Sequence, residues 1–148
     1  MSQFDLASVI WIAGGLAGVA WMAGGFLSPV AGQWRDRDRL VELKQFGPWV
    51  WGSCKIAGGT QRYLGKIWLG NLLLARRDYG QQHLLQLGFN KIQAKSVQGQ
   101  VMVRLRLKRE GDVLRGNLWG TRFKFNPQSQ RAISVQATAA EGREWIRV

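Results

Sequence analysis

Residues 101–120 spell VMVRLRLKREGDVLRGNLWG, in which Val or Leu recurs at every second position over the first eight residues. A period of two indicates a strand with one buried face. Gly111-Asp112 then predicts a two-residue hairpin turn with glycine first. Because the apolar residues of both strands share one face in this register, the pattern itself sets the pairing. The expected pairs are Lys108 with Arg115, Leu107 with Gly116, Arg106 with Asn117, Leu105 with Leu118, Arg104 with Trp119 and Val103 with Gly120.

The outer face of this hairpin is strongly cationic. Unbroken alternation beyond residue 119 would bury Arg122 and Lys124, which is costlier than shifting the chain by one residue. We therefore expect a β-bulge within residues 119–121. The cationic face is then either a binding surface or a solvated exterior that discourages edge pairing. The predicted basic surface comprises Arg104, Arg106, Lys108, Arg115, Trp119, Arg122 and Lys124.

The rest of the segment after residue 40 also favours strands. No long stretch has helical periodicity, and Gly-rich turns separate the apolar runs. Residues 81–87 suit either a short helix or a strand. We expect a small antiparallel barrel or sandwich of about seven to nine short strands, with Trp49, Trp51, Trp68 and Trp145 mainly in its core. The further strands are expected at Val41–Phe46, Trp49–Ile56, Gln61–Leu69, Leu72–Arg77, Arg131–Thr138 and Glu144–Val148.

A long apolar segment precedes this domain. Residues 6–34 contain no charged side chain, which predicts a single transmembrane helix over residues 7–28, ended by Ser28 and Pro29. A cleaved signal peptide is the alternative, but the start lacks Lys and Arg and the apolar run is too long. The expected organisation is an extracytoplasmic N-terminus (1–6), the span (7–28), a juxtamembrane linker (29–39) and a basic β-domain (40–148).

The cations beside the span set its expected orientation. Arg35, Arg37 and Arg39 follow it, and nothing comparable precedes it. Since Lys and Arg near a span stay cytoplasmic, the β-domain is expected in the cytoplasm of a single-pass membrane protein, with a bacterial inner membrane favoured. The single cysteine, Cys54, fits a reducing compartment.

Small residues within the span predict contact with another helix. Their spacing of four residues forms a groove that lets a second helix approach closely. The expected partner is another transmembrane helix or a second copy of this one. The predicted helix-packing residues are Ala13, Gly14, Ala17, Gly18, Ala20, Gly24 and Gly25.

Motifs for catalysis, metals or cofactors are weak. His83 and Cys54 are each alone in the chain, so zinc is not expected, and no local signature supports a Cys-His nucleophile. Residues 59–66 have the wrong spacing for a phosphate-binding loop. We therefore expect no enzyme and no cofactor.

Charge supplies the remaining functional information. All 21 Lys and Arg lie beyond residue 34, whereas the chain has nine acidic residues and a formal net charge of +12. This balance favours an acidic protein surface or anionic lipid headgroups as partners. We expect a membrane-anchored accessory or scaffold subunit of a membrane protein complex.

Two alternatives remain. A small barrel with Arg, Lys and Trp on one face also suits nucleic-acid binding, which ranks second because the aromatic residues are expected in the core. The third is a ligand-binding barrel: Arg35-x-x-x-Arg39 resembles the start of cyclic-dinucleotide-binding PilZ domains. The second half of that family's pattern, Asp or Asn-x-Ser-x-x-Gly, is absent, so the chain is not assigned to the family.

Overall fold

The structure is a computed structural model that describes residues 13–21, 23 and 29–148. Residues 13–21 are helical. All eight strands expected from the sequence are present, and residues 81–87 contribute a helix. The elements that follow are β1 (Gly32–Asp36), β2 (Arg39–Phe46), β3 (Trp49–Ile56), β4 (Gly59–Trp68), β5 (Asn71–Tyr79), α2 (Gln81–Gln86), α3 (Lys91–Val97), β6 (Val101–Glu110), β7 (Val113–Phe125), β8 (Ala132–Ala137) and β9 (Glu141–Arg147).

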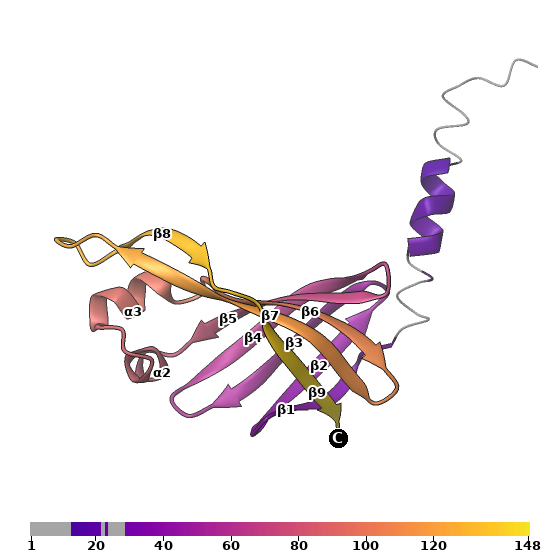
Figure 1. The fold of residues 1–148 in the computed structure, drawn as a ribbon, viewed down its shortest axis with the longest axis horizontal. Helices are drawn as coiled ribbons and strands as arrows, with labels where there is room; N and C mark the ends of the chain where they lie inside the picture. Colours follow the sequence, from indigo (N-terminus) through magenta and orange to yellow (C-terminus); the bar gives the residue numbers. More distant parts are fainter. Residues whose placement is uncertain (1–12, 22, 24–28) are drawn as a thin grey trace, which may run out of the picture.

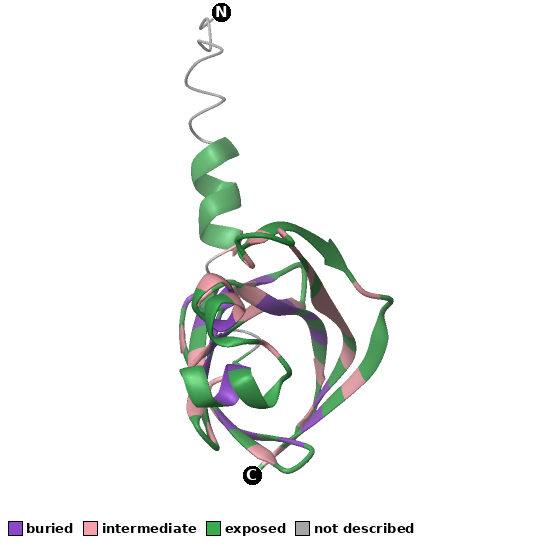
Figure 2. Ribbon diagram, turned by 90° about the vertical axis from the view of Figure 1, so that its left-hand side faces the viewer, coloured by how far each residue is buried: buried purple, intermediate pink, exposed green. Residues whose placement is uncertain are grey.

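The strands form a closed antiparallel barrel of eight strands with one strand added, as the sequence predicted in outline (Figures 1 and 2). The order is β6-β5-β4-β3-β2-β1-β9-β7, and pairing between β6 and β7 closes the ring. β8 pairs with β7 outside that ring. The seam between β1 and β9 is short, with Trp34 opposite Arg147 and Arg35 opposite Ile146.

The predicted hairpin is confirmed in its full register, from Lys108 opposite Arg115 to Val103 opposite Gly120. Gly111 has a φ of +63° and the following Asp112 does not have a positive φ, as expected for a turn with glycine first.

The bulge predicted within residues 119–121 is wrong. β7 pairs in register with β6 up to Gly120 and then with β8 from Thr121, and the register shifts only between Lys124 and Phe125. After Gly120, β7 leaves the barrel and joins β8. Each face of the strand therefore meets different neighbours, although its side chains keep alternating without a bulge within residues 119–121. Phe123 and Phe125 lie 6.1 and 5.9 Å from the Phe89 ring, while Arg122 and Lys124 remain exposed.

The segment expected as a linker, residues 29–39, instead supplies β1 and the start of β2. Trp34 and Asp36 are buried, because strand alternation directs both into the barrel. Asp36 forms an ion pair with the Arg143 guanidinium at 2.8 Å and accepts a hydrogen bond from Arg143 Nη2 at 3.1 Å. The alternating charges of residues 35–39 are therefore partly internal, and the β-domain starts before residue 40.

Large side chains fill the barrel interior. Trp34 and Trp145 are fully buried, and the Tyr63 ring packs edge-on against Trp145 with centroids 5.5 Å apart. Around them lies a layer of aliphatic side chains: Val30, Val41, Leu43, Val50, Ile67, Leu72, Leu74, Leu105, Leu107 and Leu114.

One end of the molecule carries a separate lobe, which we call the helical lobe: α2, α3, β8 and residues 121–125 of β7. Figure 1 shows it at the opposite end from helical residues 13–21. α3 was not expected from the sequence, although Asn90 caps it reciprocally with Gln93. Rings of Phe89, Phe123 and Phe125 hold this lobe together.

About half of the predicted span over residues 7–28 lies outside the described residues. Among the residues that are described, no helix has the length and apolar character needed to cross a bilayer.

Candidate functional site

Strand alternation leaves one side of the barrel wall rich in tryptophan and cations. Inward side chains fill the core, so their outward neighbours on β2 to β7 line up in rows across the sheet. We call these the tryptophan face. Its first row is Phe46, Trp49, Lys66, Leu73, Arg106 and Asn117, and its second row is Lys44, Trp51, Leu64, Ala75, Arg104 and Trp119. A third row is Trp68, Asn71, Lys108 and Arg115.

The tryptophans of this face are not in the core, contrary to the sequence-based prediction. Trp49, Trp51 and Trp68 are 50%, 41% and 47% exposed, whereas Trp145 is fully buried as expected. These three rings lie outside because Trp34 and Trp145 already fill the barrel interior. Contiguous exposed apolar surface of this kind marks binding sites in soluble domains.

A shallow groove of about 600 Å³ runs along the tryptophan face. Trp49 and Trp119 line it together with the apolar side chains of Leu64, Leu73 and Ala75. The lining includes Lys66, Arg104 and Arg106 and no carboxylate.

A glycine allows β4 and β5 to approach closely beneath the groove. A Cβ on Gly65 would overlap the backbone carbonyl of Leu73 on the neighbouring strand, so only glycine fits the observed approach of β4 to β5. The Lys66 ammonium lies 5.3 Å from the Trp68 ring centroid, which keeps that cation on the same face. This combination suits a ligand with an apolar part and an anionic part.

The predicted basic surface is divided by the structure. Arg104, Arg106 and Lys108 are exposed on β6 and Trp119 lies beside them, so these four residues are brought together. Arg122 and Lys124 belong to the helical lobe instead.

Arg115 differs from the other members of the predicted surface. It makes ion pairs with Glu144 at 2.8 Å and Glu110 at 3.0 Å. The hydrogen bond and charge of Glu144, followed by the charge of Glu110, raise the pKa of Arg115. Its charge is therefore balanced within the barrel and is less available to a partner.

The helical residues near the N-terminus contact the tryptophan face. The Trp21 ring packs edge-on against Trp49 and Trp68, with centroids 5.6 and 6.3 Å apart. This end of the face also exposes Phe46 and Leu69, by 66% and 83%. Several exposed apolar side chains therefore gather at the barrel end beside helical residues 13–21.

The predicted helix-packing residues fall partly within the described segment. A Cβ on Gly14 or Gly18 would meet no atom within 4 Å. Gly24 and Gly25 lie outside the described residues. The exposed members of the set are Ala13, Gly14, Ala17, Gly18 and Ala20.

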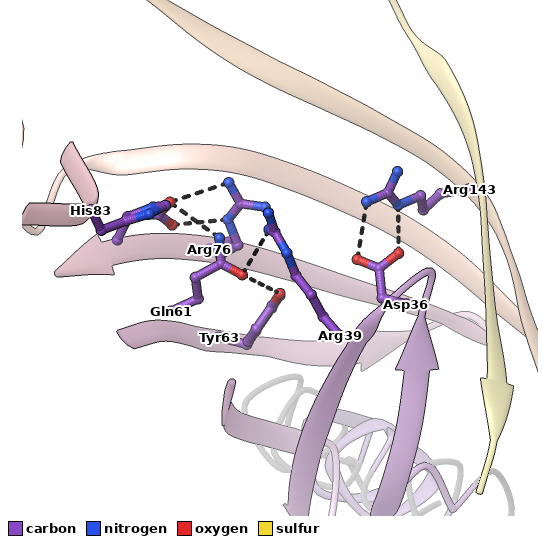
Figure 3. Close-up of polar contacts among 8 residues, drawn as sticks. Asp36, Arg39, Gln61, Tyr63, Arg76, His83 and Arg143 are labelled. Carbon is purple, nitrogen blue, oxygen red and sulfur yellow. Dashed lines mark hydrogen bonds and ion pairs between the residues drawn. The ribbon is translucent and has the colours of Figure 1, made fainter. Parts of the chain in front are cut away.

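A buried polar cluster, separate from the tryptophan face, lies inside the barrel where the helical lobe joins it (Figure 3). The fully buried carboxylate of Asp78 accepts from Arg76 Nε at 2.9 Å and Gln61 Nε2 at 3.2 Å, and lies 2.9 Å from His83 Nε2. Arg39 donates in turn to Gln61 Oε1 at 3.3 Å. These groups satisfy one another, so the cluster is a structural network.

Residues named in two sequence-based alternatives, the Cys-His pair and Arg35-x-x-x-Arg39, lie in or near this network. His83 is bonded to Asp78, and the Cys54 thiol donates to the carbonyl of Lys55, so the two are not paired as nucleophile and base. Burial raises the pKa of Cys54. Arg39 points into the barrel and Arg35 is exposed on β1. In the part of the chain that is described, no three His, Cys, Asp or Glu side chains converge for a metal.

No protein-family model, curated protein or solved structure matches this chain. The sequence signal for the groove was the alternation of Trp49 and Trp51 around Val50, which places both rings on one face. Sequence reasoning missed it because both faces of that strand are apolar.

Proposed function

We propose that this protein is a membrane-anchored accessory or scaffold subunit whose barrel docks its tryptophan face on anionic lipid headgroups. The observation that carries the proposal is the exposure of Trp49, Trp51 and Trp68 beside cations that form no ion pair with a carboxylate among the described residues. Trp21 packs edge-on against two of these rings, which links the face to the predicted span.

The chemistry of the face supports a bilayer surface. Trp rings favour the boundary between hydrocarbon and water, where the ring is covered and its N–H stays hydrated. Cations near an anionic leaflet contribute about 1 kcal/mol each, so Lys66, Arg104, Arg106 and Lys108 together would supply about 4 kcal/mol. Glycines of the predicted span would pack on other spans of the complex.

Fluorescence quenching tests the docking directly. The full chain is reconstituted in nanodiscs of neutral lipid, or of neutral mixed with anionic lipid, carrying brominated acyl chains near the headgroup. We expect quenching of tryptophan emission to increase with anionic lipid. The double variant Arg104→Gln/Arg106→Gln should lose that increase, whereas Lys55→Gln/Arg62→Gln, at exposed positions outside the groove, should keep it.

Two results would contradict the proposal. Quenching that is independent of lipid charge, or equal in both double variants, would refute the proposed contact with lipid headgroups. Recovery of the intact chain in the supernatant after detergent-free ultracentrifugation of a lysate would refute the predicted membrane anchor. Co-purification in mild detergent tests the subunit role, because a partner-free monomer would contradict it.

Nucleic-acid binding is the second candidate, favoured by the same exposed rings. Aromatic side chains beside Lys and Arg can stack on bases while the cations bind phosphates. The structure removes the earlier objection, since Trp49, Trp51 and Trp68 are outside the core. Fluorescence anisotropy with a labelled oligothymidylate at low salt tests this function. No change in anisotropy, even at low salt, would exclude it.

A further inference from the structure

The helical lobe ends in an open strand. β8 pairs with β7 on one side, and no other described strand pairs with it. Its first N–H, that of Ala132, donates to Ser96 Oγ of α3 at 2.8 Å, so the open edge begins at Ile133. Every second residue of such an edge directs its N–H and C=O away from the sheet, where another strand can bind them. Natural edges are often protected by lysine or proline, but β8 has the sequence AISVQA and contains neither.

One face of β8 is apolar and incompletely covered. Val135 lies opposite Phe123, so Ile133 and Val135 continue the phenylalanine layer of the helical lobe. Their side chains are nevertheless 58% and 62% exposed. A strand added beside β8 would therefore gain by placing apolar side chains on this face.

The opposite face of β8 lies beside cations of β7. Ser134 lies opposite Lys124 and Gln136 lies opposite Arg122, and both cations are exposed. Long Arg and Lys side chains can reach across the intervening β8 toward the next strand. A strand added there would gain by placing acidic side chains on this second face.

The whole lobe has an unusual charge balance. Residues 79–100 and 119–140 contain no Asp or Glu. Within the described residues, none of their Lys or Arg side chains makes an ion pair with a carboxylate. These cations are Lys91, Lys95, Arg122, Lys124 and Arg131.

We propose that the open edge of β8 binds an extended segment of a partner protein in which apolar and acidic residues alternate. Main-chain hydrogen bonds to β8 supply affinity, and the two faces of the edge supply the alternating specificity. A second copy of β8 is a poor occupant, because it has no acidic residue and would bring its own Arg122 and Lys124 close to the first pair. The site goes beyond the bilayer contact proposed above, since it lies in the helical lobe and not on the tryptophan face.

Peptide binding to the full chain in non-ionic detergent micelles tests this proposal. The probe is a labelled peptide of alternating valine and glutamate, and the matched peptide has the same composition with all valines before all glutamates. We expect fluorescence anisotropy to show binding of the alternating peptide only. Hydrogen exchange at Ile133 and Val135 should slow when it is bound.

Variants assign the two faces. Arg122→Gln/Lys124→Gln should weaken binding roughly tenfold, because each exposed ion pair changes affinity severalfold. Ile133→Lys should weaken it as well. Lys55→Gln/Arg62→Gln, which removes the same charge from the barrel wall, should bind the peptide like the wild-type protein.

Several outcomes would overturn the inference. Equal binding of both peptides would show charge attraction without strand pairing, and a dimer dissociated by Ile133→Lys would assign the edge to a second copy. Failure of this site is distinguishable from failure of the bilayer proposal. Arg122→Gln/Lys124→Gln should leave lipid-dependent quenching intact, and Arg104→Gln/Arg106→Gln should leave peptide binding intact.

Discussion

Replacing Asp78 by asparagine should strongly destabilise the barrel. The Asp78 carboxylate is fully buried and accepts from Arg76 and Gln61 while lying against His83. An asparagine would keep one acceptor but turn an amide N–H₂ toward donors. It would also leave the Arg76 guanidinium, which is 13% exposed, without its counter-charge.

The expected loss follows from this geometry. Removing one partner of a buried ion pair costs about 3 to 5 kcal/mol of the free energy of unfolding. For a domain of this size each kcal/mol lowers Tm by about 4 °C, so Tm should fall by about 12 to 20 °C. Because His83 belongs to α2, amide exchange at Leu84 should also accelerate.

The assay is thermal and urea unfolding of the full chain in detergent, followed by circular dichroism. Glu110→Gln provides a matched loss of one carboxylate, and its exposed pair with Arg115 should cost less than about 1 kcal/mol. If Asp78→Asn unfolds within 1 kcal/mol of Glu110→Gln, the network does not stabilise the barrel and this reasoning is refuted.

Three further predictions concern stability. Gly65→Ala should cost about 2 to 3 kcal/mol, because its Cβ would overlap a backbone carbonyl, whereas Gly142→Ala has open space and should cost little; urea unfolding compares them. Burial raises the pKa of the Cys54 thiol above the ordinary 9.0. Its contribution to stability is therefore complete below about pH 9 and is lost as pH rises through the folded-state pKa, so wild type should lose more stability than Cys54→Ala in alkaline unfolding titrations. Trp145→Ala should cost about 3 to 5 kcal/mol and Trp51→Ala less than about 1 kcal/mol, and equal losses in thermal unfolding would contradict their assignment to opposite faces of the barrel wall.

The hairpin could be predicted residue by residue because two independent constraints agree there. Gly111 permits the positive φ that a tight turn requires, and the apolar alternation sets the register from residue 103 to 120. A slip by one residue would have placed Arg104 or Arg106 in the core. Strong local patterns of this kind need no knowledge of the rest of the chain.

Other elements depend on distant partners and could not be predicted in the same way. β1 looks like a charged linker until Arg143, far along the chain, neutralises Asp36 inside the barrel. The exposure of Trp49 and Trp51 depends on which rings fill the interior first, and those are Trp34 and Trp145. Competition for interior volume is decided by the whole fold.

The seam between the first and last strands has a consequence for biosynthesis. Arg147 donates to the carbonyl of Ala31, across a separation of 116 positions, and pairing there spans few residues. Contacts between such distant positions form late, since the entropy of closing a long loop must be met first. A nascent chain leaving the ribosome would expose the β1 edge until β9 emerges, and during that interval it would be a natural client for chaperones.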